Sequence, residues 1–125
     1  MIALLDAINI QRILIEKFGG ATGIRDRNLL ESALMRPYQT FDGKELYETP
    51  VKKAAAIIES IVTNHPFVDG NKRFGYVAMR LILMDSGLDL FATQQAKYNF
   101  VLKIAKGDLR YDGIHDWIMK NVEQK

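Results

Sequence analysis

Nine consecutive residues near the middle of the chain combine the side chains that phosphate chemistry needs: His65-Pro66-Phe67-Val68-Asp69-Gly70-Asn71-Lys72-Arg73. They bring together an imidazole, a carboxylate, a glycine, an amide and two cations, and a long apolar segment follows at once. This order of residues indicates a loop that ends one helix, carries reactive groups and presents an anion to the start of the next helix.

The last four of these residues, Gly70-Asn71-Lys72-Arg73, stand where the next helix is expected to begin. The first amide hydrogens of a helix have no partner inside it, and the helix dipole favours negative charge at that end. Glycine lets a phosphate approach the backbone, while the amide and the two cations offer side-chain donors. Because two cations at a helix N-terminus oppose the dipole, a bound anion best explains them. We therefore expect a phosphate site here.

Asp69 and His65 are candidates for two further functions, and each has a simpler alternative. A carboxylate beside a phosphate site is well placed to hold Mg²⁺ together with phosphate oxygens and water. Asp69 could instead be only the N-cap of the following helix, since aspartate is a preferred cap. A neutral imidazole at position 65 could accept the proton of a hydroxyl that attacks the phosphate, although an isolated histidine is usually structural or solvated. Their combination in one short stretch favours chemistry.

The elements that must position this stretch are helices. Apolar residues at helical spacing predict six of them: over residues 2–18, between Asp26 and Pro37, between Pro50 and Asn64, over 74–84, between Thr93 and Gly107, and from Asp112 to Val122. The segment 74–84 has one charged residue and is expected to be a central helix surrounded by the others. Two apolar stripes over 2–18 predict that this helix is largely buried. The fold class is therefore all-α, a compact six-helix bundle around a central apolar helix.

Several shorter features complete the prediction. Asp26, Thr93 and Asp112 are candidate N-caps. The turn signal Asp42-Gly43 predicts a short hairpin within residues 38–48, and Leu88–Phe91 is expected to be a connector without further strand. Arg25 and Arg36 flank the second helix and are expected at the surface, either solvated or in weak ion pairs.

Composition limits the remaining possibilities. The chain has 125 residues, which suits a single domain over 1–125, and it has no cysteine for disulfides or thiolate metal sites. Its net charge is +2 and no basic block is long enough to suggest direct binding of nucleic acid. No segment reaches the roughly 18–20 apolar residues of a membrane span. We expect a soluble, cytoplasmic protein.

The pattern His-x-Phe-x-Asp-Gly-Asn-Lys-Arg at residues 65–73 resembles the signature of the Fic/Doc superfamily. Lys72 stands where a typical Fic signature has glycine, and Tyr76 where it has a second arginine, which makes the chain similar to the Doc (death-on-curing) toxin branch. The resemblance extends to the upstream Doc pattern and beyond the signature, at Gly23-Ile24-Arg25-Asp26, Leu30-Glu31-Ser32-Ala33-Leu34, Arg36-Pro37 and Gly87-Leu88.

This resemblance implies an activity and a set of roles. His65 would be the general base, Asp69 would hold Mg²⁺, Gly70 and Asn71 would line the anion hole, and Lys72 and Arg73 would bind the phosphates of ATP. The family further implies a toxin of a type II toxin–antitoxin system that places the γ-phosphate on a threonine of elongation factor Tu and arrests protein synthesis.

The same resemblance leaves alternatives and adds a partner. A Fic-type transfer of AMP to a protein hydroxyl is the main alternative, and a non-catalytic binding module is a third possibility. The implied partner is a Phd-like antitoxin. Residues 38–48 resemble the family's flap, a hairpin that pairs with extended target segments.

Overall fold

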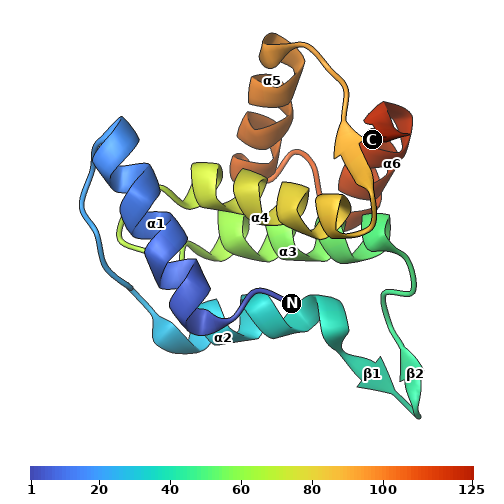
Figure 1. Ribbon diagram of the computed structural model, residues 1–125, viewed down its shortest axis with the longest axis horizontal. Coiled ribbons are helices and arrows are strands. Elements are labelled where there is room, and N and C mark those ends of the chain that lie inside the picture. The colour runs from blue at the N-terminus through green and yellow to red at the C-terminus, as the bar shows by residue number, and fades with distance from the viewer.

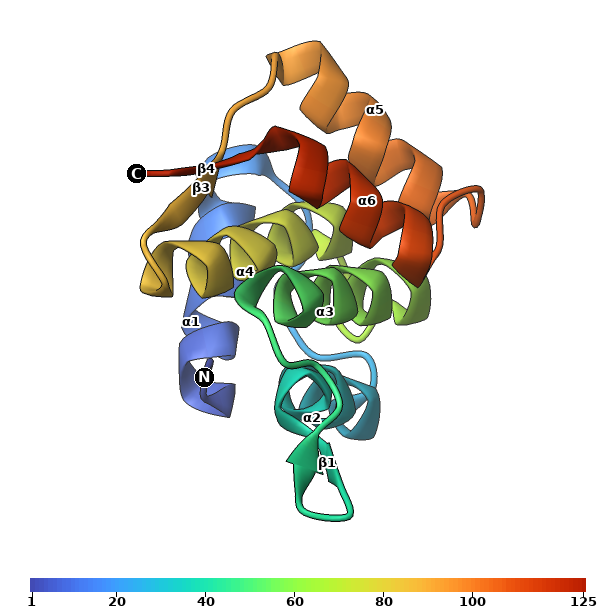
Figure 2. The same cartoon turned by 90° about the vertical axis from the view of Figure 1, so that its right-hand side faces the viewer.

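Two helices side by side form the centre of the molecule. A computed structural model describes residues 1–125, and in it α3 (Pro50–Asn64) and α4 (Asn71–Asp85) contribute ten and seven buried residues. In Figures 1 and 2 these two helices run through the middle of the molecule. The other helices surround them: α1 (Leu4–Phe18), α2 (Arg27–Met35), α5 (Gln94–Ala105) and α6 (Tyr111–Asn121), with a short 3₁₀ turn at Arg36–Tyr38. The predicted all-α bundle is confirmed.

The centre is a pair of helices rather than the single central helix that the sequence predicted. Every residue from Ala54 to Val62 in α3 is buried, because α2, α4, α5 and α6 all pack around this helix. In α4, by contrast, Leu81 and Met84 reach the surface. The neighbouring helices therefore do not cover all of the apolar residues of α4, and α4 shares the central position with α3.

The prediction that the first helix is largely buried is wrong. Only Ala7, Gln11 and Ile15, one residue per turn, are buried in α1. Leu5 is 74% exposed and Ile13 is 53% exposed. The reason is position: α1 lies at the margin of the bundle, where one face packs on α4 and the residues of its outer side, such as Leu5 and Ile13, are exposed.

Side-chain caps fix the starts of three helices. The Asp26 carboxylate accepts a hydrogen bond from the Leu29 amide at 3.0 Å, and the Thr93 hydroxyl accepts one from Ala96 at 3.0 Å, so both predicted caps are confirmed. Thr49 caps α3 in the same way. Asp112 is not a cap, because α6 already begins at Tyr111 with Arg110 before it.

A hairpin forms where the turn signal predicted one. Strands β1 (Thr40–Phe41) and β2 (Lys44–Glu45) are antiparallel, and Asp42 and Gly43 between them have φ of +53° and +78°. Positive φ at both central residues is the two-residue turn that suits a hairpin. Figure 1 places the hairpin at the start of α3, at the opposite end of this helix from the loop that joins α3 to α4.

The connector prediction for Leu88–Phe91 is wrong. Leu88–Leu90 forms strand β3, which pairs antiparallel with β4 (Val122–Gln124) at the end of the chain. Three-residue strands are too short to show a periodicity of their own, and the partner strand lies more than thirty positions away.

Arg36 forms an ion pair, which was one of its two predicted roles, but the pair is mostly buried and does not lie at the surface. Its guanidinium donates to Glu59 Oε1 at 2.9 Å and to Ser60 Oγ at 2.9 Å on α3, and to the Tyr47 hydroxyl at 2.9 Å beyond the hairpin. Because the Glu59 side chain is mostly buried, this ion pair ties the segment before α3 to the helix itself.

None of the helices combines the length and apolarity needed to cross a membrane.

Candidate active site

The loop between α3 and α4, residues 65–70, reverses the chain through two left-handed residues. His65 ends α3 with φ of +50°, and Gly70 precedes α4 with φ of +76°. Phe67 between them is buried and packs edge-on against Phe74 of α4, with ring centroids 4.8 Å apart. This contact anchors the 65–70 loop to the core and leaves its polar residues outside.

Asn71 closes this loop. Its Oδ1 accepts a hydrogen bond from the Phe67 amide at 3.0 Å, and its Nδ2 donates to the Phe67 carbonyl at 3.0 Å. Both bonds are buried, so they hold the loop in one shape. The side chain that was expected to line an anion hole is therefore engaged with the loop, and the main contribution of Asn71 to an anion would come from its backbone amide.

The start of α4 is uncapped. No side chain accepts a hydrogen bond there, and the amides of Asn71, Lys72 and Arg73 have no acceptor in the structure. The Lys72 and Arg73 side chains are exposed and neither forms an ion pair. The Arg73 guanidinium instead lies 4.3 Å from the ring centroid of Phe18, which limits its movement. Unpaired amides and unpaired cations at one helix end together favour an anion.

A cleft of about 640 Å³ opens beside this helix end. Its walls come from α1, α4 and α5: Leu14, Phe18, Gly70, Asn71, Lys72, Arg73, Tyr76, Val77, Gln94, Lys97, Tyr98, Val101 and Leu102. We call it the α4 cleft. No carboxylate lines it, and more than half of its residues are apolar. A cleft with cationic and apolar walls suits a ligand that has both an anionic and an aromatic part.

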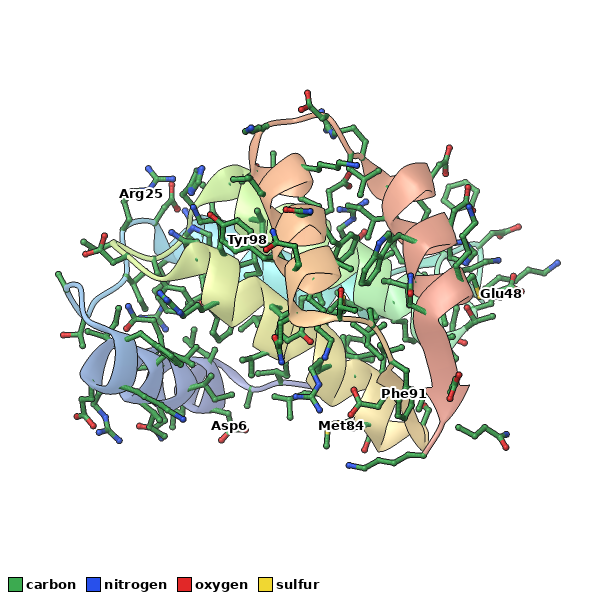
Figure 3. The ribbon with its side chains drawn as sticks, turned by 90° about the horizontal axis from the view of Figure 1, so that it is seen from above. Asp6, Arg25, Glu48, Met84, Phe91 and Tyr98 are labelled. Carbon is green, nitrogen blue, oxygen red and sulfur yellow. The ribbon has the colours of Figure 1, made fainter.

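Sequence reasoning missed the contribution of α5 to this cleft. Gln94 and, one turn later, Lys97 and Tyr98 lie on one face of α5, which crosses above α4 in Figure 3. Their spacing of three and four residues was the available signal. On its own that signal describes any solvated helix face, since the sequence does not say which helix faces Lys72.

Asp69 is not the N-cap of α4, because that position belongs to Gly70. The Asp69 Oδ2 accepts a hydrogen bond from the Ala21 amide at 2.7 Å, and its Oδ1 has no partner. No group of three or more acidic or histidine side chains could hold a metal ion alone. One free carboxylate oxygen fits Mg²⁺ when phosphate oxygens and water complete its shell, which is how this ion usually binds.

His65 stands at the exposed end of the loop. Its imidazole makes no hydrogen bond to another residue, and it does not line the α4 cleft. Its backbone is fixed by Arg25, whose Nε donates to the His65 carbonyl at 2.6 Å and whose Nη2 donates to the Asn64 carbonyl at 2.7 Å. Arg25 was predicted to be solvated or weakly paired. It instead satisfies carbonyls that the last turn of α3 leaves without partners.

Residues 2–83 match the model of the family described as Fic/DOC. The chain belongs to the Fic/DOC family. It is also similar to Toxin Doc of Mycolicibacterium smegmatis, with 41% identity over 75 residues that make up 60% of this chain and 58% of that relative. The match thus spans less than two thirds of the relative's length. The resemblance read from residues 65–73 is confirmed, and the likeness to Toxin Doc agrees with the Doc branch.

In this Fic/DOC chain the signature residues divide between two places. Gly70, Asn71, Lys72 and Arg73 line the α4 cleft, whereas His65 and Asp69 belong to the exposed side of the 65–70 loop. A polyphosphate at the first turn of α4 would therefore have cations and amides on the cleft side. The imidazole and the carboxylate would meet it from the loop side.

Proposed function

We propose that this Fic/DOC chain is a Doc-type toxin of a type II toxin–antitoxin system. In this proposal it transfers the γ-phosphate of ATP to a threonine hydroxyl of a translation factor, such as elongation factor Tu. The observation that carries the proposal is the uncapped start of α4, where three amides have no acceptor and two cations have no anionic partner, beside a loop with one imidazole and one carboxylate. The likeness to Toxin Doc supports the choice of branch.

Binding would use the two parts of the site. The amides of residues 71–73 and the charges of Lys72 and Arg73 would hold the phosphates. Mg²⁺ at the free oxygen of Asp69 would neutralise part of the phosphate charge. The α4 cleft, with Tyr98 and apolar residues in its walls, offers space for the nucleoside. We expect no step in which Asn71 changes its side-chain partners.

The transfer itself is a displacement at phosphorus. The target hydroxyl oxygen forms a bond to the γ-phosphorus, and the bond from that phosphorus to the bridging oxygen of the β-phosphate breaks, so ADP leaves. His65 takes the hydroxyl proton, which requires its neutral form. The hairpin lies at the other end of α3, so we assign it no part in this step.

Lys72 is the residue that favours phosphate transfer over AMP transfer. It replaces the glycine of the typical Fic signature, and Tyr76 replaces the second arginine, so one cation of that signature is absent. In Doc the nucleotide is reversed in the cleft, and we extend that orientation to this chain.

The expected inhibitor is a Phd-like antitoxin, and the expected compartment is the cytoplasm.

The test uses two labels. The protein is incubated with elongation factor Tu and ATP labelled at either the γ- or the α-phosphate, and label on the target is measured. We expect label from the γ-position alone and a mass increase of one phosphate. Label from the α-position would establish AMP transfer instead. A His65→Asn variant serves as the control: if it still arrests growth while no label is transferred by either protein, the chain is a binding module.

A further inference from the structure

A second segment, residues 20–26, runs alongside the 65–70 loop and is bonded to it along its length. The amides of Arg25 and Asp26 both donate to the Pro66 carbonyl, at 2.8 and 3.0 Å, and the Val68 amide donates to the Gly23 carbonyl at 3.0 Å. These bonds join parts of the chain that are about forty positions apart. The 20–26 segment therefore decides where the loop residues lie, although it contributes none of the signature.

One buried side chain joins this segment to Asp69. Gln11, in the middle of α1, is 2% exposed. Its Nε2 donates to the Ala21 carbonyl at 3.3 Å and to the Asp69 carbonyl at 3.2 Å, while its Oε1 accepts from the Gly23 amide at 3.4 Å. A buried amide in an otherwise apolar face is costly unless it is bonded, and here all of its bonds go to the two segments.

The carboxylate of Asp69 depends on the same contacts. Its Oδ2 is held by the Ala21 amide, and Ala21 is held in turn by Gln11. The packing is close: a Cβ on Gly20 would lie 3.2 Å from the Asp69 Cβ and 3.3 Å from its Oδ2, and Gly20 has φ of +109°. With Oδ2 fixed in this way, Oδ1 is the oxygen left for a metal ion.

We propose that Gln11 is a positioning residue for Asp69. Gln11 holds the Ala21 peptide so that the Ala21 amide binds Oδ2 of Asp69. It also holds the Asp69 carbonyl, so that the Asp69 side chain points away from the loop in one direction. The inference rests on the proposed function in one respect, namely that Asp69 binds Mg²⁺ together with a nucleotide. Gln11 itself touches neither ligand.

The test measures the magnesium requirement of nucleotide binding rather than activity alone. Binding of a non-hydrolysable ATP analogue is followed by calorimetry while the Mg²⁺ concentration is varied, for the natural chain and for Gln11→Leu. Because groups that orient a metal ligand typically change metal affinity 10–100-fold, we expect Gln11→Leu to need about tenfold more Mg²⁺ for half-maximal effect. Analogue binding without Mg²⁺ should be unchanged, since the cations of α4 are untouched.

A matched control separates positioning from stability. Ile118→Ala removes buried volume in α6, away from the loop, and should lower the melting temperature without changing the Mg²⁺ requirement. Gln11→Met is the second variant, for use if Gln11→Leu does not fold. Its unbranched side chain fills a similar space but cannot donate to the two carbonyls, so the same rise in Mg²⁺ requirement is expected.

Two results would count against the inference, and they differ. An equal Mg²⁺ requirement in the natural chain and in a folded Gln11 variant would overturn the positioning role alone. No Mg²⁺-dependent nucleotide binding by the natural chain would overturn the proposed function and the inference with it.

Discussion

At the scale of single residues, His65 has a backbone role as well as a chemical one. It holds a left-handed conformation, with φ of +50°, at the end of α3. Histidine and asparagine adopt this conformation more readily than most residues with a Cβ, and alanine in its place would add strain of about 1 kcal/mol. A change to alanine would therefore mix a loss of chemistry with a loss of stability.

His65→Asn separates the two effects. Asparagine tolerates the left-handed backbone but cannot act as the base, so we expect the transfer rate to fall by about 10²–10⁴ while the melting temperature stays close to that of the natural chain. Phosphate transfer to the target and thermal unfolding by circular dichroism measure the two quantities. Asp69→Asn is the parallel change, because its amide oxygen can still accept the Ala21 hydrogen bond. Full activity of His65→Asn would show that the imidazole is not the base.

The site was predictable from sequence only where its residues are neighbours. Residues 65–73 lie in one stretch, so their types and order were enough to propose them as a candidate site. Gln11 and Asp69 are 58 positions apart, and Arg25 and His65 are 40 apart. From sequence alone, a lone glutamine in an apolar helix or an arginine beside an N-cap is expected to be exposed. Only the fold shows which residues it contacts.

At the scale of elements, the contact between α3 and α4 depends on one glycine. A Cβ on Gly75 of α4 would lie 2.7 Å from Cγ2 of Val62 and 3.5 Å from side-chain atoms of Ile58 and Ile61. The closest of these distances is shorter than real Cβ contacts allow. Gly75 therefore lets the two central helices approach each other closely.

Gly75→Ala should destabilise the protein although alanine favours helices. The substitution gains up to about 1 kcal/mol of helix propensity, but overpacking a buried contact typically costs about 1–3 kcal/mol. We expect a net loss of about 1 kcal/mol in the free energy of unfolding, measured by urea denaturation. Combining it with Val62→Ala should cost less than the sum of the two single changes, because the added methyl group would fill space that the valine leaves. Strict additivity would indicate that the clash is relieved elsewhere.

Helices were predictable as elements and the second sheet was not, for one physical reason. A helix of eleven or more residues repeats its apolar pattern several times, so α3 and α5 could both be placed, and α5 could be placed together with its Thr93 cap. Strands β3 and β4 have three residues each, and their pairing depends on where α6 returns the chain. The same dependence on neighbours explains why the apolar residues of α1 overstated its burial.

At the scale of the whole molecule, an ion pair joins the second sheet to the central helices. Asp89 of β3 accepts hydrogen bonds from Arg80 of α4, from Nε at 2.9 Å and from Nη2 at 2.6 Å. These bonds lower the pKa of the Asp89 carboxyl to about 2, although its burial acts in the opposite direction. Because β3 carries the pairing with β4, this ion pair helps to hold the end of the chain against the central helices.

Acid should weaken the ion pair between Arg80 and Asp89 in a defined range of pH. The folded pKa of Asp89, about 2, lies below its ordinary value of 3.8, so its stabilisation is complete above about pH 4 and is lost as the pH falls through about 2. The lowered pKa corresponds to a contribution of at most about 2.5 kcal/mol to the free energy of unfolding. Since the Arg80 side chain is 39% exposed, solvent screens the pair, and we expect a contribution of about 1–2 kcal/mol.

The variant Asp89→Asn tests this range directly. Asparagine keeps the shape but not the charge, so its free energy of unfolding in urea should lie about 1–2 kcal/mol below that of the natural chain at neutral pH. That difference should shrink steadily below about pH 4, because protonation then removes the charge from the natural chain as well. Glu16→Gln, which breaks the exposed pair with Arg12, should differ little from the natural chain at any pH, since exposed pairs contribute little. If the Asp89→Asn difference were as large at the acid end of the titration as at neutrality, shape rather than charge would hold the two strands in place.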